Sequence, residues 1–307
     1  MKFAYVTDTH LKGINPINRK GDYYLEVMNK IREIINIAKK MKCEFIIHGG
    51  DLYDSAIVSN QMIDELVDLI EKSKIIWYIL IGNHDEIGHS WELSKGSSLA
   101  HIFNRSDYIK ELDVIEDKDC LIQGFKYYHN IEQDLKEKGI ISIKSISSNK
   151  IAIVHALITK KPLPENVMHL SIKDLKTDFD YIFIAHNHEQ YGLFEQKGVK
   201  FISLGCLGRT AINELIMPTI AIFDSKTGKL DLIPLKCAKP GNEVFDLEKA
   251  AELKNFDNEI DKFIASLDTT KIAELNLMGI IEFLAKENNL DEEIKQEIIK
   301  RIGVKND

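Results

Sequence analysis

The sequence lacks the features that mark membrane, disulfide-rich and zinc-finger proteins. Its 307 residues contain four cysteines, none of them in a CxxC pair. A disulfide framework or cysteine-based zinc knuckle is therefore not indicated, and the four are expected to be buried or partly buried thiols. No stretch approaches the roughly 20 apolar residues of a membrane span. The start, MKFAYVTDTH, lacks the basic segment and apolar run of a signal peptide, so a cytoplasmic location without membrane contact is expected.

An excess of basic residues is also missing. The chain has 48 acidic residues against 40 Lys and Arg, a net charge of -8. This balance argues against a broad basic face that holds nucleic acid nonspecifically. It does not exclude phosphodiester chemistry. Two divalent cations held by only two carboxylates would leave a site with a charge of about +2, which attracts phosphate locally.

The first third of the chain alternates short apolar runs with helical patterns. Residues 2–7, 44–48 and 75–80 have the length and near-continuous hydrophobicity of strands covered on both faces. Residues 22–42 and 60–72 carry apolar residues at helical spacing between them. Right-handed crossovers make such strands parallel, so a β-α-β-α-β start is predicted.

The later chain divides into a strand-rich part and a helical part. Further strands are predicted at 120–125, 151–154, 181–185, 199–204 and 219–223. The predicted fold class is α/β, a two-layer mixed β-sheet sandwich flanked by helices, with a small helical C-terminal region. The turn-prone Lys239-Pro240-Gly241 marks a boundary between a catalytic domain over 1–238 and a helical region over 239–307. Helical apolar stripes in that region are predicted over 253–267, 272–284 and 294–302.

Polar side chains follow five of the predicted strands directly. The blocks are DTH at 8–10, GGD at 49–51, GNHD at 82–85, a lone histidine at 155 and HNH at 186–188. Ligand sites of open α/β sheets form at the carboxyl ends of strands, so these blocks are expected to converge. Imidazole, carboxylate and carboxamide groups suit a pair of intermediate divalent metals. The predicted metal ligands are Asp8, His10, Asp51, Asn83, His155, His186 and His188.

Each block alone has a simpler explanation. D-x-H occurs often by chance, Gly-Asn is equally a turn, and HxH could be a solvated strand edge. The order of all five blocks, each placed after an apolar strand, indicates a metal site. Glycines before Asp51 and Asn83 would let the backbone turn sharply and approach the ions.

This order, spanning about residues 1 to 235, resembles the calcineurin-like metallophosphoesterase superfamily. The resemblance implies two divalent metal ions, with Mn²⁺ as the first expectation and Mg²⁺, Fe²⁺ or Zn²⁺ as alternatives. It implies hydrolysis of phosphoesters through a two-metal-activated hydroxide. Asp85 is expected to orient His84 or another group beside the ligands. The implied roles are Asp8, His10, Asp51 and His188 on the first metal, Asp51, Asn83, His155 and His186 on the second, and His84 as the catalytic residue that protonates the leaving oxygen.

Flanking segments resemble the SbcD-type nucleases of DNA double-strand-break repair. They are DTHLKG at 8–13, Arg19 with the helix opening at Asp22, HGGDLYD at 48–54 and SLGCLGRT at 203–210. The chain departs from that branch at Asp54, where several members have histidine, and at Ala185, where glycine is common. The branch implies an exonuclease or endonuclease acting on single- or double-stranded DNA, with an SbcC-like ATPase as a partner.

Alternatives accompany each of these implications. The helices at 22–42 and 60–72 could form a homodimer interface or simply pack on the sheet. The C-terminal helices could bind the ATPase, clamp DNA or form a small structural subdomain. A small-molecule phosphodiesterase or nucleotide pyrophosphatase would share every predicted ligand. A noncatalytic scaffold with the same fold is disfavoured, because the ligand set and His84 are intact.

Overall fold

The computed structural model describes residues 1–88, 93–164, 166–251, 281–282, 285–286 and 290–302. The chain divides into two compact units, Met1–Phe245 and Asp246–Asp307. In the described part of the second unit, helix α8 covers Glu292–Ile302, where the third helical stripe was predicted. The predicted stripe over 253–267 lies outside the described residues, as does that over 272–284 apart from residues 281 and 282. Across the described part of the chain, no helix combines the length and apolar character needed to cross a membrane.

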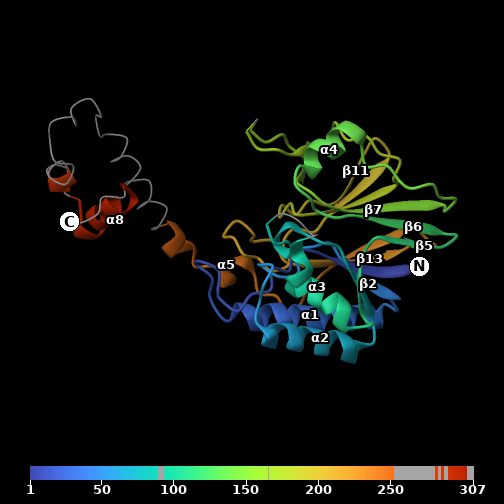
Figure 1. Cartoon of the computed structure of the whole chain (residues 1–307), viewed down its shortest axis with the longest axis horizontal. Helices are drawn as coiled ribbons and strands as arrows, with labels where there is room; N and C mark the ends of the chain where they lie inside the picture. The colour runs from blue at the N-terminus through green and yellow to red at the C-terminus, as the bar shows by residue number, and fades with distance from the viewer. Residues whose placement is uncertain (89–92, 165, 252–280, 283–284, 287–289, 303–307) are drawn as a thin grey trace. The chain divides into compact units, whose positions relative to one another are not determined.

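Two six-stranded sheets form the first unit (Figure 1). The first sheet has the order β14-β13-β1-β2-β3-β4, and strands β1 to β4 run parallel. β13 pairs antiparallel with β1, and β14 antiparallel with β13. The strand bounds are β1 Lys2–Val6, β2 Phe45–His48, β3 Ile76–Ile79, β4 Ile109–Glu111, β13 Thr219–Asp224 and β14 Lys229–Pro234.

The second sheet has the order β11-β12-β10-β7-β6-β5, with β12, β10, β7 and β6 parallel and an antiparallel strand at each edge. A separate pair, β8 and β9, is parallel. The bounds are β5 Val114–Glu116, β6 Cys120–Phe125, β7 Asn149–His155, β8 Ile158–Thr159, β9 Leu170–Ser171, β10 Tyr181–Ala185, β11 Gly192–Gln196 and β12 Val199–Ser203.

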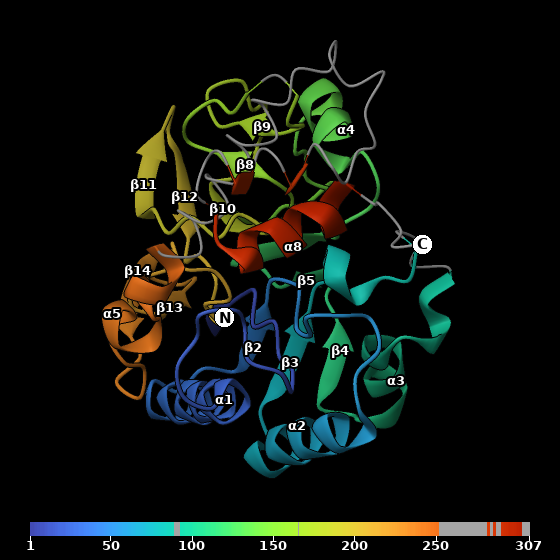
Figure 2. The same ribbon diagram turned by 90° about the vertical axis from the view of Figure 1, so that its left-hand side faces the viewer.

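Helices cover the outer faces of both sheets. In Figures 1 and 2, α1, α2 and α3 lie along the first sheet and α4 lies on the far side of the second. The helix bounds are α1 Tyr23–Lys40, α2 Asn60–Ser73, α3 Ser98–Arg105, α4 Ile131–Lys138 and α5 Gly241–Val244, with short 3-10 turns η1 at Asn83–Asp85 and η2 at Leu93–Gly96. The predicted two-layer α/β fold with outer helices is confirmed.

Both crossover helices begin at side-chain caps. The carboxylate of Asp22 accepts a hydrogen bond from the N–H of Leu25, and the hydroxyl of Ser59 does the same for Met62. Such caps satisfy backbone donors that have no partner within the helix. The apolar faces of α1 and α2 pack on the sheet in one buried cluster with Ala4 and Val6.

Strand β1 is apolar after Lys2 because both of its faces are buried. Ala4 and Val6 face the helices, whereas Phe3 and Tyr5 face the second sheet. The rings of Tyr5 and Phe183 meet edge to face with centroids 4.8 Å apart. The Tyr5 hydroxyl also donates to the Ile184 carbonyl over 3.3 Å. Because strands of both sheets are tied here, the carboxyl ends of β1 and β10 are held side by side.

A buried lysine links α1 to the turn that follows β12. Lys30 is 1% exposed, and its ammonium donates to the carbonyls of Leu207 (2.7 Å) and Gly208 (3.2 Å). Burial, together with the nearby charges of Arg209 and Arg19, lowers the pKa of Lys30 to about 7. The folded chain therefore releases this proton at a lower pH than the unfolded chain does.

The free energy of unfolding should consequently rise with pH through the Lys30 contribution. The unfolded chain keeps the proton up to a pKa of about 10.4, so the term grows from pH 7 to that value. Between pH 7 and 9 it amounts to about 2 kcal/mol. Urea unfolding of the metal-free protein at both pH values should show an increment smaller by this amount in Lys30→Met. Exposed Lys39→Met on the same helix serves as the control. Equal increments in Lys30→Met and the unsubstituted chain would contradict the assignment.

Candidate metal centre

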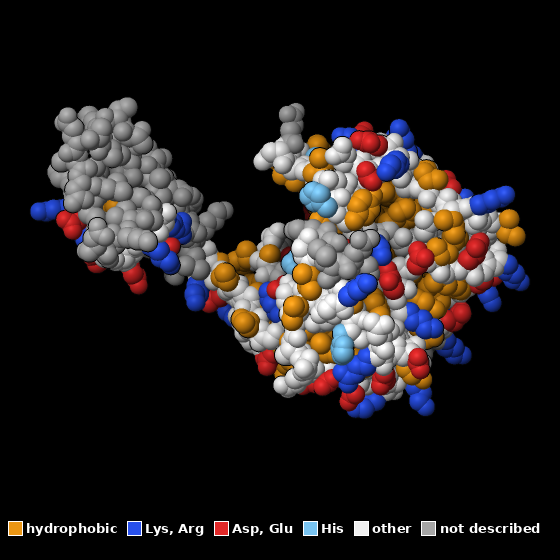
Figure 3. Space-filling view, in the orientation of Figure 1, with side chains coloured by type: hydrophobic (Ala, Val, Ile, Leu, Met, Phe, Trp, Pro, Cys, Tyr) orange, Lys and Arg blue, Asp and Glu red, His pale blue; other side chains and the backbone are white. Residues whose placement is uncertain are grey.

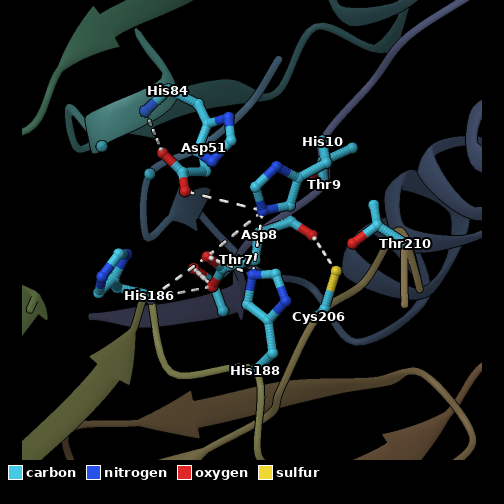
Figure 4. Close-up of polar contacts among 12 residues, drawn as sticks. Thr7, Asp8, Thr9, His10, Asp51, His84, His186, His188, Cys206 and Thr210 are labelled. Atoms are coloured by element: carbon cyan, nitrogen blue, oxygen red, sulfur yellow. Dashed lines mark hydrogen bonds and ion pairs between the residues drawn. The ribbon is translucent and has the colours of Figure 1, made fainter. Parts of the chain in front are cut away.

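The predicted ligands lie at the carboxyl ends of strands from both sheets. Asp8 and His10 follow β1, and Asp51 follows β2. Asn83 opens the 3-10 turn after β3, His155 ends β7, and His186 and His188 follow β10. All seven side chains are thus carried to one rim where the sheets meet, as the parallel topology requires. Figure 4 shows most of this cluster.

One set of donor atoms surrounds His10 (Figure 4). Its Nε2 lies 3.1 Å from His188 Nε2, 3.7 Å from Asp51 Oδ2 and 3.9 Å from Asp8 Oδ1. His188 Nε2 lies 3.7 Å from the same Asp8 oxygen. Ligands about 2.1 Å from one ion lie roughly 3 to 3.5 Å apart when they are neighbours in its coordination sphere. Small adjustments would therefore let this set hold one divalent cation.

A second set surrounds His155. Its Nε2 lies 3.0 Å from Asn83 Oδ1 and 3.4 Å from Asp51 Oδ2. Ligand atoms of Asp51, His155 and His186 all lie within 4.8 Å of one another. The same Asp51 oxygen therefore belongs to both sets, the position of a carboxylate that bridges two ions. The ligand atoms of a third group, His10, Asp51 and His84, likewise lie within 4.8 Å of one another.

The Asp51 carboxylate is oriented by backbone groups. Its Oδ1 accepts a hydrogen bond from the N–H of His84 over 2.9 Å, which turns Oδ2 toward the two imidazoles. The buried carboxylate of Asp85 accepts from the N–H groups of Gly82 (2.9 Å) and Asp51 (3.0 Å). Asp85 was expected to orient either His84 or another group beside the ligands. Its bonds to the backbone of Asp51 and Gly82 match the second of these roles. The His84 ring is instead held by the Asp54 carbonyl, 2.7 Å from Nδ1.

Two glycines make room for these groups. A Cβ on Gly82 would collide with the backbone and carboxylate of Asp51 and with the His155 ring. A Cβ on Gly50 would collide with His155, and the φ of Gly50 is +110°, which L side chains rarely adopt. The glycines before Asp51 and Asn83 thus leave the backbone close to the side chains of Asp51 and His155, and their predicted approach to the ions stays a prediction.

Four of the predicted ligands have left-handed backbone. The φ values are 52° for Asp8, 45° for His10, 54° for Asp51 and 69° for His186. Positive φ is uncommon for residues other than glycine and costs free energy that the surrounding fold must offset. Such conformations cluster at functional sites. Here they occur where the chain leaves strands β1, β2 and β10, at the rim where the predicted ligands lie.

The protonation pattern of the metal-free centre reflects its buried carboxylates. Burial would raise the pKa of Asp51, but His155 and His10 outweigh it and hold the pKa well below its usual range. Burial would lower the pKa of His155, but Asp51 outweighs it and raises the pKa to about 9. Burial, with His155, lowers the pKa of His186 to about 3, so that imidazole is neutral. In the metal-free protein, bound protons thus offset the negative charge of the carboxylates, as a bound cation would. Metal binding would release these protons.

Further groups hold the imidazoles from behind. Glu214 Oε1 lies 2.5 Å from His188 Nδ1, and Asp54 Oδ1 lies 3.4 Å from His10 Nδ1. The Gly49 carbonyl accepts from His155 Nδ1 over 2.9 Å. The bonds to Nδ1 of His188 and His155 favour the tautomer that leaves Nε2 free for a metal. His10 Nδ1, in contrast, lies beyond the usual hydrogen-bond distance from Asp54. Glu214 was not predicted from the sequence, because it lies 26 residues after His188 in a segment without a periodic pattern.

Two candidate donor sets that share a carboxylate lie at the joined ends of the two sheets, an arrangement that could hold two metal ions. Residues 1–197 match the calcineurin-like phosphoesterase family. The chain belongs to this family and is a phosphoester hydrolase. Enzymes of the family depend on a dinuclear metal centre, which agrees with the donor groups found here.

Curated relatives carry the name DNA double-strand break repair protein Mre11. The protein from Thermoplasma acidophilum is 25% identical over 297 residues, which cover 90% of this chain and 75% of that protein. That from Methanococcus maripaludis is 27% identical over 62% of this chain and 52% of its own length. That from Saccharolobus solfataricus is 23% identical over 64% and 52%. The chain thus spans about half the length of the latter two.

Solved structures with detectable likeness include one described as a novel archaeal phosphodiesterase. It is 19% identical, with a TM-score of 0.40, over 76% of this chain and 100% of that chain. The protein TT1561 of Thermus thermophilus is 10% identical, with a TM-score of 0.45, over 76% and 98%.

Proposed function

We propose that this phosphoester hydrolase is a metal-dependent DNA nuclease, an exonuclease or endonuclease acting in DNA double-strand-break repair. The observation that carries the proposal is the complete pair of donor sets sharing Asp51 Oδ2. The Mre11 names of the curated relatives support DNA as the substrate. The charge balance fits a nuclease that binds phosphate mainly at its metal centre. Acidic and basic side chains are interspersed on the face shown in Figure 3.

The seven predicted ligands divide between two ions in this proposal. Two divalent ions would supply the charge that polarises the phosphoryl oxygens and activates the attacking water. Mn²⁺ is the proposed metal, with Mg²⁺, Fe²⁺ and Zn²⁺ as alternatives. The first ion is assigned to Asp8, His10, Asp51 and His188, and the second to Asp51, Asn83, His155 and His186.

His84 is assigned the role of general acid. Its Nδ1 lies 2.7 Å from the Asp54 carbonyl, which can only accept, so Nδ1 carries a proton. The other ring nitrogen, Nε2, can then pass a proton to the leaving oxygen from the imidazolium form of the ring, in which both nitrogens carry protons. The ring packs edge to face on His10 with centroids 4.7 Å apart, which fixes its position beside the first donor set.

A substrate comparison with purified protein tests the proposal. With Mn²⁺, we expect degradation of single-stranded DNA or of double-stranded DNA with free ends, together with hydrolysis of bis(p-nitrophenyl) phosphate. Chelation with EDTA should abolish both activities, and restored Mn²⁺ should recover them. Hydrolysis of the small diester with DNA left intact would reject the nuclease and favour a small-molecule phosphodiesterase or nucleotide pyrophosphatase, as the net charge of -8 would allow.

The proposal extends to location and partners. We assign residues 1–238 to catalysis in the cytoplasm and residues 239–307 to DNA capping or to binding an SbcC-like ATPase. A homodimer through the outer surfaces of α1 and α2 belongs to the same proposal. It is supported by half-exposed Leu25 on α1, although most apolar side chains of both helices face the sheet. Sedimentation of the purified chain tests the dimer, and mixing with such an ATPase tests the partner.

A further inference from the structure

A cysteine in the turn after β12 lies against the first donor set. Cys206 is 6% exposed, and its Sγ lies 3.3 Å from the carbonyl oxygen of Asp8. Backbone hydrogen bonds join the turn to β1, from Leu207 N–H to the Thr7 carbonyl (3.4 Å) and from Gly208 N–H to the Asp8 carbonyl (3.1 Å). The sulfur is therefore held in place by the segment that carries Asp8 and His10.

The sulfur faces two imidazoles of that set. Ligand atoms of His10, His188 and Cys206 all lie within 4.8 Å of one another. Figure 4 shows Cys206 beside Asp8 and His188. The backbone N–H of Arg209 donates to Sγ over 3.2 Å, which fixes one side of the sulfur. Two nitrogen donors and one sulfur donor are a ligand combination that zinc and related metals accept.

The two imidazoles are spaced as ligands of one ion would be. Their Nε2 atoms lie 3.1 Å apart, within the roughly 3 to 3.5 Å expected between neighbouring ligands of one ion. A carboxylate lies beside Nδ1 of each ring, Asp54 at 3.4 Å from His10 and Glu214 at 2.5 Å from His188. Cys206 is the soft donor next to this pair.

We propose that Cys206 supplies a sulfur ligand to the ion held by His10 and His188. On binding, the thiol would lose its proton to solvent and the sulfur would coordinate as thiolate. A sulfur donor would shift the metal preference of this position from Mn²⁺ and Mg²⁺ toward Zn²⁺, Fe²⁺ or Co²⁺. The second donor set contains only nitrogen and oxygen atoms, so it would have no such preference for metals that bind sulfur. The inference rests on the proposed metal centre and makes its two positions chemically unequal.

Cobalt substitution tests the inference without measuring activity. Protein loaded with Co²⁺ should show a near-ultraviolet band from charge transfer between thiolate and cobalt. Cys206→Ser should lose that band while still binding Co²⁺, since the hydroxyl is nearly isosteric. Cys43→Ser is the matched control and should retain it, because Cys43 precedes β2 at the opposite edge of the sheet. Circular dichroism of each variant checks the fold.

X-ray absorption of the Zn²⁺-loaded protein gives a second readout. A sulfur shell at about 2.3 Å is expected in the unsubstituted protein and should be missing in Cys206→Ser. The affinity of the variant for Zn²⁺ should fall by about 10- to 100-fold or more, with that for Mn²⁺ nearly unchanged. Bound Co²⁺ without a sulfur band would overturn the role of Cys206 and leave the metal centre standing. Failure to bind any Co²⁺ would reject the proposed centre itself.

Discussion

Asp51→Asn is expected to lose at least one of two bound metal ions and to slow phosphodiester hydrolysis by about 1000-fold or more, since metal ions contribute several kcal/mol to such reactions. The reason is that a single oxygen of Asp51 lies 3.7 Å from His10 Nε2 and 3.4 Å from His155 Nε2, so both donor sets depend on it. A neutral amide removes half of the carboxylate charge available to the two ions. Metal content by mass spectrometry and the hydrolysis rate of bis(p-nitrophenyl) phosphate measure the two effects.

Asp68→Asn provides the control for this substitution. Asp68 lies on α2, is largely exposed and pairs with Lys72 over 3.2 Å, so the same chemical change there should leave metal content and rate intact. An Asp51→Asn variant that retains two ions and the full rate would show that the shared carboxylate does not bridge them.

His84→Ala is expected to reduce the rate of DNA hydrolysis by about 100- to 10,000-fold while two metal ions remain bound. The effect should depend on the leaving group. A nitrophenolate leaves without needing a proton, so hydrolysis of bis(p-nitrophenyl) phosphate should fall much less. His101→Ala is the control, because His101 is exposed on α3. Rates on both substrates, with metal content, distinguish the possible roles.

Three results would alter the assignment of His84. Unchanged DNA hydrolysis would remove its catalytic role. Loss of a metal ion would make it a ligand, as its place in the His10, Asp51 and His84 group allows. An equal fall on both substrates, with both ions retained, would point to a positioning role for the substrate instead of proton donation.

The strands around the centre were predictable because both of their faces are buried. β1, β2 and β10 are apolar at nearly every position, β7 is apolar over residues 151–154, and each of the four leads into a polar block. Strands with other surroundings were missed. β11 alternates between half-buried and exposed positions at a sheet edge, and β4 has three residues. Where a strand buries little apolar surface, its sequence carries little signal.

Some residues of the candidate site could likewise be predicted from the sequence, and others could not. Topology predicts that residues at the carboxyl ends of parallel strands converge, which brought Asp8, Asp51 and His186 together from the sequence. Glu214 and Cys206 reach the site from irregular turns, whose course depends on tertiary contacts and not on a repeating pattern. The tautomer of His188 depends on Glu214, so the sequence predicted which residues would meet but not which atoms face inward.

The left-handed backbone at Asp8, His10, Asp51 and His186 has an evolutionary consequence. Each such conformation costs about 1 to 3 kcal/mol, whereas the whole fold of a typical protein is stable by only about 5 to 15 kcal/mol. A lineage selected for thermal robustness alone would replace these residues with glycine, which adopts positive φ freely. Their presence at the ends of β1, β2 and β10 therefore places a stability cost on this fold. Loss of function in this fold would therefore leave a recognisable trace, glycine accumulating at the ends of the same strands.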